Sequence, residues 1–345
     1  MTEPVLTIVV PCYNEEEILP MTFYELSNLL RDLKSEKRVS PHSKILFIDD
    51  GSKDRTWQMI YKKSLEDEHI RGLKLSRNVG HQNALLAGLF AAKDASDCVV
   101  SIDADLQDDI HVIKQFLKKY EEGYEVVYGV RRKRETDTFF KRTTAEGFYK
   151  LMKKMGVDLI YNHADYRLMS KKALQELEKF KEANLFLRGI VPLIGFQSTS
   201  VFYDRKERLA GETKYPLKKM LSFAFDGITS FSVTPIRMVM LVGFLSFFIS
   251  LLFGVYFFSL KIFGHTELGW TSVITSIWLL GGIQLIAIGL IGEYIGKTYK
   301  ESKQRPKYIV DVDLFNLARP VHMKASEREE DESYGLGFGT LSKTN

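Results

Sequence analysis

Two aspartates at the end of a short apolar run are the residues of this sequence best suited to chemistry. Asp103 and Asp105 follow the run 98–100, whose composition is typical of a short buried strand. Because side chains alternate along an extended chain, these two carboxylates can point to the same side. Their oxygens suit a hard divalent cation that is also bound by substrate phosphates. The alternative is a solvated turn in which the aspartates cap a helix.

Three other strand-like segments also end in polar or acidic residues. The segments 11–16, 49–54 and 76–84 each follow a short apolar run. In an open α/β sheet, ligands bind at the edge formed by the carboxyl ends of the strands. Any one of these segments could be a helix cap or a plain turn. Four of them at one edge favour a shared binding site over four separate caps.

The elements that must position these residues alternate along the chain. Strand-like segments are followed by helix-like segments, an order typical of a mostly parallel sheet covered by helices. We therefore predict an α/β fold. The predicted strands are 6–10, 44–48, 72–75, 98–100 and 125–128, and the predicted helices are 16–33, 54–68, 82–93 and 110–120.

Two long uncharged runs follow the α/β region. They extend from Met238 to Leu260 and from Leu268 to Gly292. About 20 apolar residues in a helix cross a bilayer, so each run is long enough to span a membrane. A pair of buried core helices is the alternative. Lysines and arginines gather before the first run and after the second, which predicts that both ends of the chain are cytosolic. These residues are Lys218, Lys219, Arg237, Lys297, Lys300, Lys303, Arg305 and Lys307.

The charge pattern divides the chain into four predicted parts. The segment before the first run mixes lysines with apolar residues, which favours a helix at the membrane surface over a soluble connector. The end of the chain is rich in acidic residues and glycines, which favours disorder. The predicted parts are an α/β domain at 1–213, a juxtamembrane amphipathic helix at 214–235, two transmembrane helices within 236–296 (about 238–260 and 269–292), and a partly disordered cytosolic tail at 297–345.

Composition excludes some classes of protein. Lys and Arg total 48 against 44 Asp and Glu, and the resulting formal charge of +4 does not indicate a nucleic-acid partner. Cys12 and Cys98 lie far apart in predicted strands, so we expect buried free thiols rather than a disulfide or metal site. The N-terminus lacks the basic region of a signal peptide, so we expect the α/β domain in the cytosol.

The strand-end motifs together resemble those of the family-two glycosyltransferases, which have the nucleotide-sugar-binding GT-A fold. The shared motifs are Val10-Pro11-Cys12-Tyr13-Asn14-Glu15, Asp49-Asp50-Gly51-Ser52, Asn78 with Gly80, and Asp103-Ala104-Asp105. Three further motifs are similar to the polyprenyl-phosphate glycosyltransferases, which include bactoprenol glucosyltransferases and dolichyl-phosphate mannose synthases. They are Asp105-Leu106-Gln107-Asp108, Tyr128-Gly129-Val130-Arg131 and Ala164-Asp165-Tyr166-Arg167-Leu168-Met169. The resemblance covers about residues 5–310.

This resemblance implies an inverting transfer of one sugar from a nucleotide-diphosphate sugar to a polyprenyl phosphate. We expect UDP-glucose as the donor and undecaprenyl phosphate as the acceptor. Mg²⁺ or Mn²⁺ would neutralise the charge that develops on the diphosphate leaving group. The implied metal ligands are Asp103, Asp105 and Gln107. The implied nucleotide-sugar pocket is formed by Pro11, Tyr13, Asn14, Glu15, Asp50, Asn78, Gly80, Asp103 and Ala104.

The acceptor side of the predicted site rests on an aspartate and several basic residues. Asp165 acts as a general base or positions the donor sugar in this interpretation, and an ion pair with Arg167 is the alternative. A guanidinium suits bidentate phosphate recognition, so we expect Arg131 to bind the lipid phosphate. Asp165, Asp105 and Arg131 are the predicted catalytic residues. The other predicted phosphate-binding residues are Arg132, Arg205, Arg208 and Lys214.

Several alternatives to this function stay open. UDP-N-acetylglucosamine is a second donor, and GDP-mannose would make the protein a mannose synthase. A processive polysaccharide synthase or a sugar nucleotidyltransferase would need motifs that are missing from this sequence. A catalytically inactive membrane adaptor would not need the acidic motifs. A flippase and a downstream glycosyltransferase are the implied partners, and Gly292 with Gly296 suggests weakly a homo-oligomer.

Overall fold

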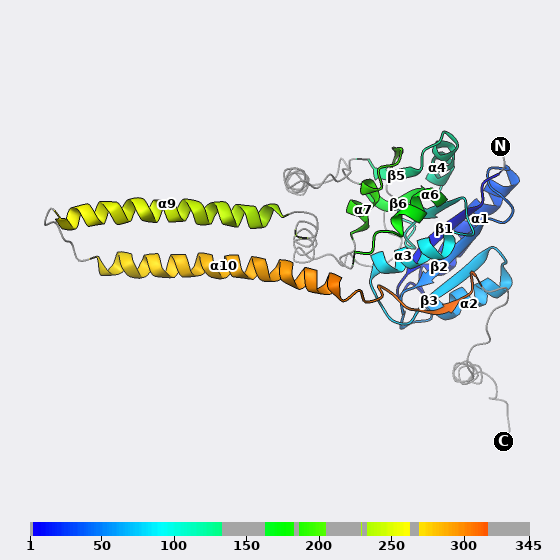
Figure 1. Cartoon of the computed structure of the whole chain (residues 1–345). Coiled ribbons are helices and arrows are strands. Elements are labelled where there is room, and N and C mark those ends of the chain that lie inside the picture. Colours follow the sequence, from blue (N-terminus) through cyan, green and yellow to red (C-terminus); the bar gives the residue numbers. More distant parts are fainter. Residues whose placement is uncertain are drawn as a thin grey trace, which may run out of the picture. The chain divides into compact units, whose positions relative to one another are not determined.

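The computed structural model describes residues 3–132, 163–182, 186–204, 229, 233–262 and 269–316 (Figure 1). The chain divides into two compact units. The first unit consists of Met1–Leu106 with Tyr308–Asn345, and the second unit is Gln107–Lys307.

The first unit contains a five-stranded section of sheet in the order β4-β1-β2-β3-β8. The four strands β1 to β4 are parallel, and β1 is buried along its whole length, as expected where helices cover both faces. The strands of the first unit are β1 (Leu6–Cys12), β2 (Lys44–Asp49), β3 (Ile70–Leu75), β4 (Cys98–Ser101) and β8 (Val310–Asp313). Its helices are α1 (Leu19–Ser35), α2 (Thr56–Glu66) and α3 (His81–Ala92).

These elements confirm the predicted α/β alternation, with shifted ends. Helix α1 begins at Leu19 and not at residue 16, because the residues before it form a turn in which Asn14 has φ 53°. Helix α3 packs tightly on the sheet at Gly88, where a Cβ would lie 2.5 Å from Cδ1 of Ile48 and 2.6 Å from Cγ1 of Val9. Both cysteines are buried and free, as expected.

Strand β8 was not predicted. It pairs antiparallel with β3, and the Nζ atom of Lys74 lies 3.3 Å from a carboxylate oxygen of Asp311. The buried side chains of Leu314 and Phe315 follow it. The strand has only four residues, and acidic side chains alternate with its two valines, so the sequence carries no apolar run to mark it.

The second unit contains a three-stranded section in the order β7-β5-β6. Strand β5 is parallel to β7 and antiparallel to β6. Among the described strand pairs, parallel pairs therefore outnumber antiparallel ones. Its strands are β5 (Val126–Arg131), β6 (His163–Ser170) and β7 (Ser198–Tyr203). Its shorter helices are α4 (Val112–Glu121), α6 (Lys171–Leu177) and α7 (Leu187–Leu193).

Two long apolar helices complete the second unit and match the two predicted spans. Helices α9 (Thr234–Ile262) and α10 (Trp270–Ser302) run antiparallel beside each other (Figure 1). Large apolar side chains such as Leu252 and Ile286 are exposed on them. By length and composition, both helices could cross a membrane. Most of the predicted amphipathic helix at 214–235 lies outside the described residues.

Candidate active site

The polar strand ends of the first unit are tied together by hydrogen bonds through the buried carboxylate of Asp50. Its Oδ1 accepts from the backbone N–H of Val79 (2.7 Å) and its Oδ2 from that of Gly80 (3.0 Å). Burial raises the pKa of Asp50, and these two N–H donors partly offset that rise. Asp50 therefore fixes the loop between β3 and α3, which contains the predicted site residues Asn78 and Gly80.

Gly51 lets the same loop approach the end of β2. Its φ is +64°, and a Cβ at this position would lie 2.6 Å from backbone atoms of Arg77 and Asn78. Only glycine combines this left-handed conformation with so close a backbone contact. Gly80 also has positive φ, at +89°, and lies immediately before α3.

The end of β1 is attached to the end of β2 in a similar way. The backbone N–H of Asn14 donates to Oγ of Ser52 (3.0 Å), and Oδ1 of Asn14 accepts from the N–H of Lys53 (2.8 Å). The N–H of Glu15 donates to Oγ1 of Thr56 (2.9 Å). Pro11 is buried, whereas the ring of Tyr13 is exposed and could cover a nucleotide base. The predicted pocket residues of this segment thus lie on a fixed backbone.

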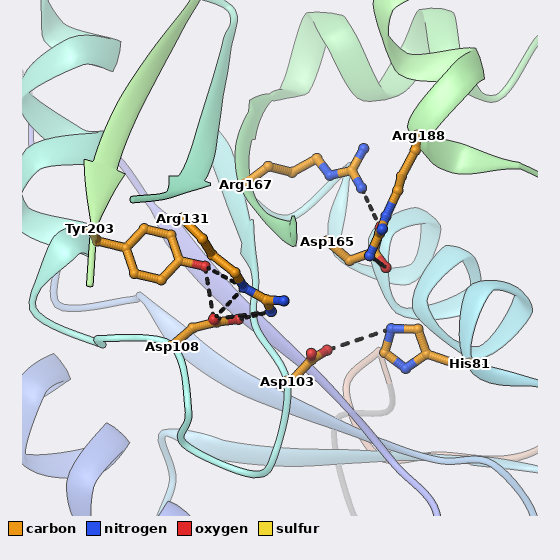
Figure 2. A network of polar contacts seen from close by, with 8 residues as sticks. All are labelled: His81, Asp103, Asp108, Arg131, Asp165, Arg167, Arg188 and Tyr203. Carbon is orange, nitrogen blue, oxygen red and sulfur yellow. Dashed lines mark hydrogen bonds and ion pairs between the residues drawn. The ribbon is translucent and has the colours of Figure 1, made fainter. Parts of the chain in front are cut away.

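The two aspartates after β4 are half-buried, and the alanine between them is anchored. The carbonyl oxygen of Ala104 accepts from Oγ1 of Thr22 on α1 (2.8 Å). A carboxylate oxygen of Asp103 lies 3.5 Å from Nε2 of His81, the first residue of α3 (Figure 2). Leu106 next to Asp105 has φ 53°, a strained conformation for a leucine that marks this loop as constrained.

Asp103 and Asp105 fit a divalent cation, but not a site made by the protein alone. Among the residues that the structure describes, no group of three or more His, Cys, Asp or Glu side chains is arranged to hold a metal ion. A Mg²⁺ site typically has one or two carboxylates and takes its other ligands from water and substrate phosphates. A pair of carboxylates is chemically suited to a metal of this kind. Gln107, the third predicted ligand, is buried.

In the second unit, Arg131 is held by two side chains that the sequence analysis did not select. Its Nε and Nη2 donate to the two carboxylate oxygens of Asp108, both at 3.2 Å (Figure 2). The hydroxyl of Tyr203 donates to Oδ1 of Asp108 at 2.8 Å. Burial alone would lower the pKa of Arg131, but the Asp108 carboxylate more than reverses this, so the guanidinium stays charged. Burial also raises the pKa of Tyr203, as does the same carboxylate.

Asp165 lies between two arginines. Nη2 of Arg167 lies 2.7 Å from Oδ1 of Asp165, so the ion pair named as the alternative for this residue is present. Nε and Nη2 of Arg188 on α7 lie 3.4 and 3.3 Å from Oδ1 and Oδ2 of Asp165 (Figure 2). The second of these partners was not predicted.

The remaining predicted acceptor residues are only partly described. Arg132 is exposed, and its Nη1 lies 3.4 Å from a carboxylate oxygen of Asp204. Arg205, Arg208 and Lys214 lie outside the described residues. Four polar residues that contact the predicted site residues were not themselves predicted: His81, Asp108, Arg188 and Tyr203. Two of them carried a signal, because His81 lies in the polar segment 76–84 and Asp108 in the motif that begins with Asp105.

A mostly parallel sheet with acidic residues at its strand ends is the architecture of an α/β enzyme that binds its ligand at that edge. The model of the family "Glycosyl transferase family 2" matches residues 7–178. Among curated relatives, the uncharacterized glycosyltransferase YkoT of Bacillus subtilis is 62% identical over 95% of this chain and 98% of its own length. The bactoprenol glucosyl transferase of Shigella phage SfV is 42% identical over 88% of this chain and 97% of its own length.

Solved structures resemble the chain less closely. Glucosyl-3-phosphoglycerate synthase from Mycobacterium tuberculosis is 18% identical and has a TM-score of 0.44, over 66% of this chain and 76% of that chain. The curated relatives and the family model show that the chain belongs to glycosyltransferase family 2. It is an enzyme that transfers a sugar.

Proposed function

We propose that this glycosyltransferase moves glucose from UDP-glucose to undecaprenyl phosphate, with inversion at the anomeric carbon. One observation carries the proposal: the chain aligns with nearly the whole length of a relative named bactoprenol glucosyl transferase. That alignment covers 88% of this chain. Bactoprenol is a polyprenyl lipid, so the two apolar helices fit an enzyme whose acceptor is in a membrane.

The first unit supplies the groups for the donor. Tyr13, Asn14, Asp50 and Gly80 lie on loops that internal hydrogen bonds hold in place. Asp103 and Asp105 would hold Mg²⁺ or Mn²⁺ on the diphosphate. When bound, the cation stabilises the negative charge that appears on the leaving UDP. Fixed side chains of this kind need no rearrangement during the reaction, which lowers its barrier.

The second unit supplies positive charge for the acceptor. A phosphate monoester has a second pKa of about 6, so the lipid phosphate is largely a dianion at neutral pH and is already a nucleophile. Arg131, whose guanidinium Asp108 orients, would bind this phosphate. The phosphate oxygen forms a bond to the anomeric carbon as the bond to UDP breaks, and the electron pair leaves with UDP.

The membrane arrangement that suits this reaction has the active site on the cytosolic face. Nucleotide sugars are made in the cytosol, and the basic residues beside both apolar helices favour that orientation. Both termini are then cytosolic, and the connection between the two helices faces outside. The lipid-linked glucose would leave through a flippase and serve a later glycosyltransferase.

A donor screen tests the proposal. Purified protein in detergent is given undecaprenyl phosphate, Mg²⁺ or Mn²⁺, and in separate reactions UDP-glucose, UDP-N-acetylglucosamine or GDP-mannose. Nucleotide release that depends on the lipid phosphate is expected with UDP-glucose at the highest kcat/KM. A preference for GDP-mannose would make the protein a mannose synthase. No release with any donor would contradict the proposal and favour an inactive adaptor.

A further inference from the structure

The carboxylate of Asp165 is bound on both of its oxygens by arginines. Arg167 contacts Oδ1, and Arg188 contacts both Oδ1 and Oδ2. A general base must offer a lone pair to the proton that it removes. A carboxylate whose two oxygens both accept from guanidinium groups is poorly placed for this task. The geometry suits a different role, in which Asp165 holds the arginines.

The side chains of Asp165, Arg167 and Arg188 together carry a net positive charge, and Arg188 is the most exposed of the three. Arginine is protonated at all ordinary pH values, so two guanidiniums and one carboxylate sum to +1. The side chain of Arg167 is 2% exposed and that of Asp165 is 13% exposed, whereas that of Arg188 is 34% exposed. An anion that approaches this cluster therefore meets Arg188 first.

We propose that Arg188 binds a phosphate group of the substrates and that Asp165 is a positioning residue that fixes its guanidinium. This inference rests on the proposed function, which supplies two phosphate-bearing substrates. The phosphate belongs either to the lipid acceptor or to the diphosphate of the donor. Both offer the same tetrahedral oxygens, for which the planar fork of an arginine is well suited.

The reaction needs no base at Asp165. The acceptor dianion and UDP-glucose, also with two negative charges, carry four negative charges in total. The products are a phosphodiester with one negative charge and UDP with three. One carbon–oxygen bond forms, one breaks, and no proton has to move. Positive charge near the phosphates assists this exchange more than a proton acceptor would.

The arrangement at Asp165 parallels that at Asp108. In each case a carboxylate faces the guanidinium of a more exposed arginine, Arg131 or Arg188, with two nitrogens of the guanidinium in contact. Asp108 has a tyrosine hydroxyl as its further partner, and Asp165 has the buried Arg167. The recurrence within one unit supports a common purpose, the presentation of a fixed cation.

The test compares Arg188→Gln, Arg188→Lys, Asp165→Asn and the double variant, with Arg31→Gln as the matched control. Arg31 is an exposed arginine on α1 that donates to Asn28. KM for undecaprenyl phosphate, KM for UDP-glucose and kcat are measured over a range of pH. We expect Arg188→Gln to raise the KM for one of the two substrates at least about tenfold, as for loss of a charge-assisted hydrogen bond.

If Asp165 positions Arg188, the other variants should also behave in characteristic ways. Asp165→Asn is expected to raise the same KM as Arg188→Gln and to leave the pH profile of kcat unchanged. In the double variant, this KM should exceed that of Arg188→Gln alone by less than about threefold. Arg188→Lys is expected to recover part of the loss. The proposal is overturned if Arg188→Gln leaves both KM values unchanged, or if Asp165→Asn lowers kcat about a thousandfold at unchanged KM and removes the acidic limb of the profile.

Binding measurements separate this inference from the proposed function. Calorimetry with UDP and with citronellyl phosphate, a short prenyl phosphate, needs no turnover. Weaker binding of one ligand to Arg188→Gln than to wild type supports the inference and identifies which phosphate is bound. Equal binding of both ligands by the two proteins contradicts it, even when the wild type is active. An inactive wild type that still shows the difference contradicts only the choice of substrates.

Discussion

The aspartates of the two units of this glycosyltransferase have different partners. In the first unit, Asp50 accepts from backbone N–H groups and fixes a loop, while Asp103 and Asp105 stay half-buried. In the second unit, Asp108 and Asp165 face arginines. The first arrangement presents negative oxygens, as a cation site requires, and the second presents positive guanidiniums, as an anion site requires. The same residue type therefore has different partners in the two units, and our proposal assigns it a different role in each.

The largest expected effect follows from removing a carboxylate of the first unit. Asp105→Ala should lower kcat at least about a thousandfold, because charge on the leaving diphosphate would lose its cation. The protein should remain folded and in the membrane, since Asp105 is half-buried in a turn after β4. Turnover is followed by release of UDP, and folding by thermal melting. Near-normal activity in this variant would remove Asp105 from the site.

Chelation should reproduce this loss in the wild type. Activity is expected to disappear with EDTA and to return with Mg²⁺ or Mn²⁺, while Asp105→Ala stays inactive with either ion. Full activity in EDTA would mean that the carboxylates of the first unit do not act through a metal.

A second prediction concerns the anion side. Asp108→Asn removes one partner of a buried ion pair, a change that typically costs about 3–5 kcal/mol of stability. We also expect the KM for undecaprenyl phosphate to rise about tenfold and the KM for UDP-glucose to stay constant, because Arg131 loses its fixed orientation. Tyr203→Phe, which keeps the ion pair, is the milder control. A rise only in the KM for the donor would assign Arg131 to the other substrate.

The smallest expected effect comes from the matched change in the first unit. This change is Asp50→Asn. The amide side chain has one acceptor oxygen, so one of the N–H groups of Val79 and Gly80 loses its partner. This should cost about 1–3 kcal/mol of stability, measured by chemical unfolding. Here the KM for UDP-glucose should rise while the KM for the lipid phosphate stays constant. A change in the KM for the lipid phosphate would contradict the assignment of the first unit to the donor and the second unit to the acceptor.

The sequence was sufficient to predict the strands β1 to β5, because they are short apolar runs with polar ends, whereas β6 and β7 were not predicted. Val99 and Val100 before Asp103 illustrate this pattern, and strand β4 is found there. The two long helices could also be predicted, because each contains a long run of uncharged, apolar residues. Strand β8 could not be predicted, because its four residues gain their stability from pairing with β3 and not from an apolar pattern of their own.

The partners of the predicted site residues were harder to predict than the strands that carry those residues. The contact of Tyr203 with Asp108 joins positions 95 residues apart, and that of Arg188 with Asp165 joins positions 23 residues apart. Neither pair has a local spacing that marks it. Asp165 and Arg167 are two residues apart on one strand, and for that reason their ion pair was foreseeable.

The proposed transfer of glucose to a lipid phosphate can be tested by the mass of the lipid product. Purified protein is incubated with undecaprenyl phosphate, UDP-glucose and Mn²⁺, and the organic phase is analysed by mass spectrometry. Transfer to the lipid should give a lipid heavier than the acceptor by one hexose residue, in a molar amount equal to the UDP released, and absent with Asp105→Ala. Release of UDP with free glucose in the aqueous phase and no heavier lipid would contradict it.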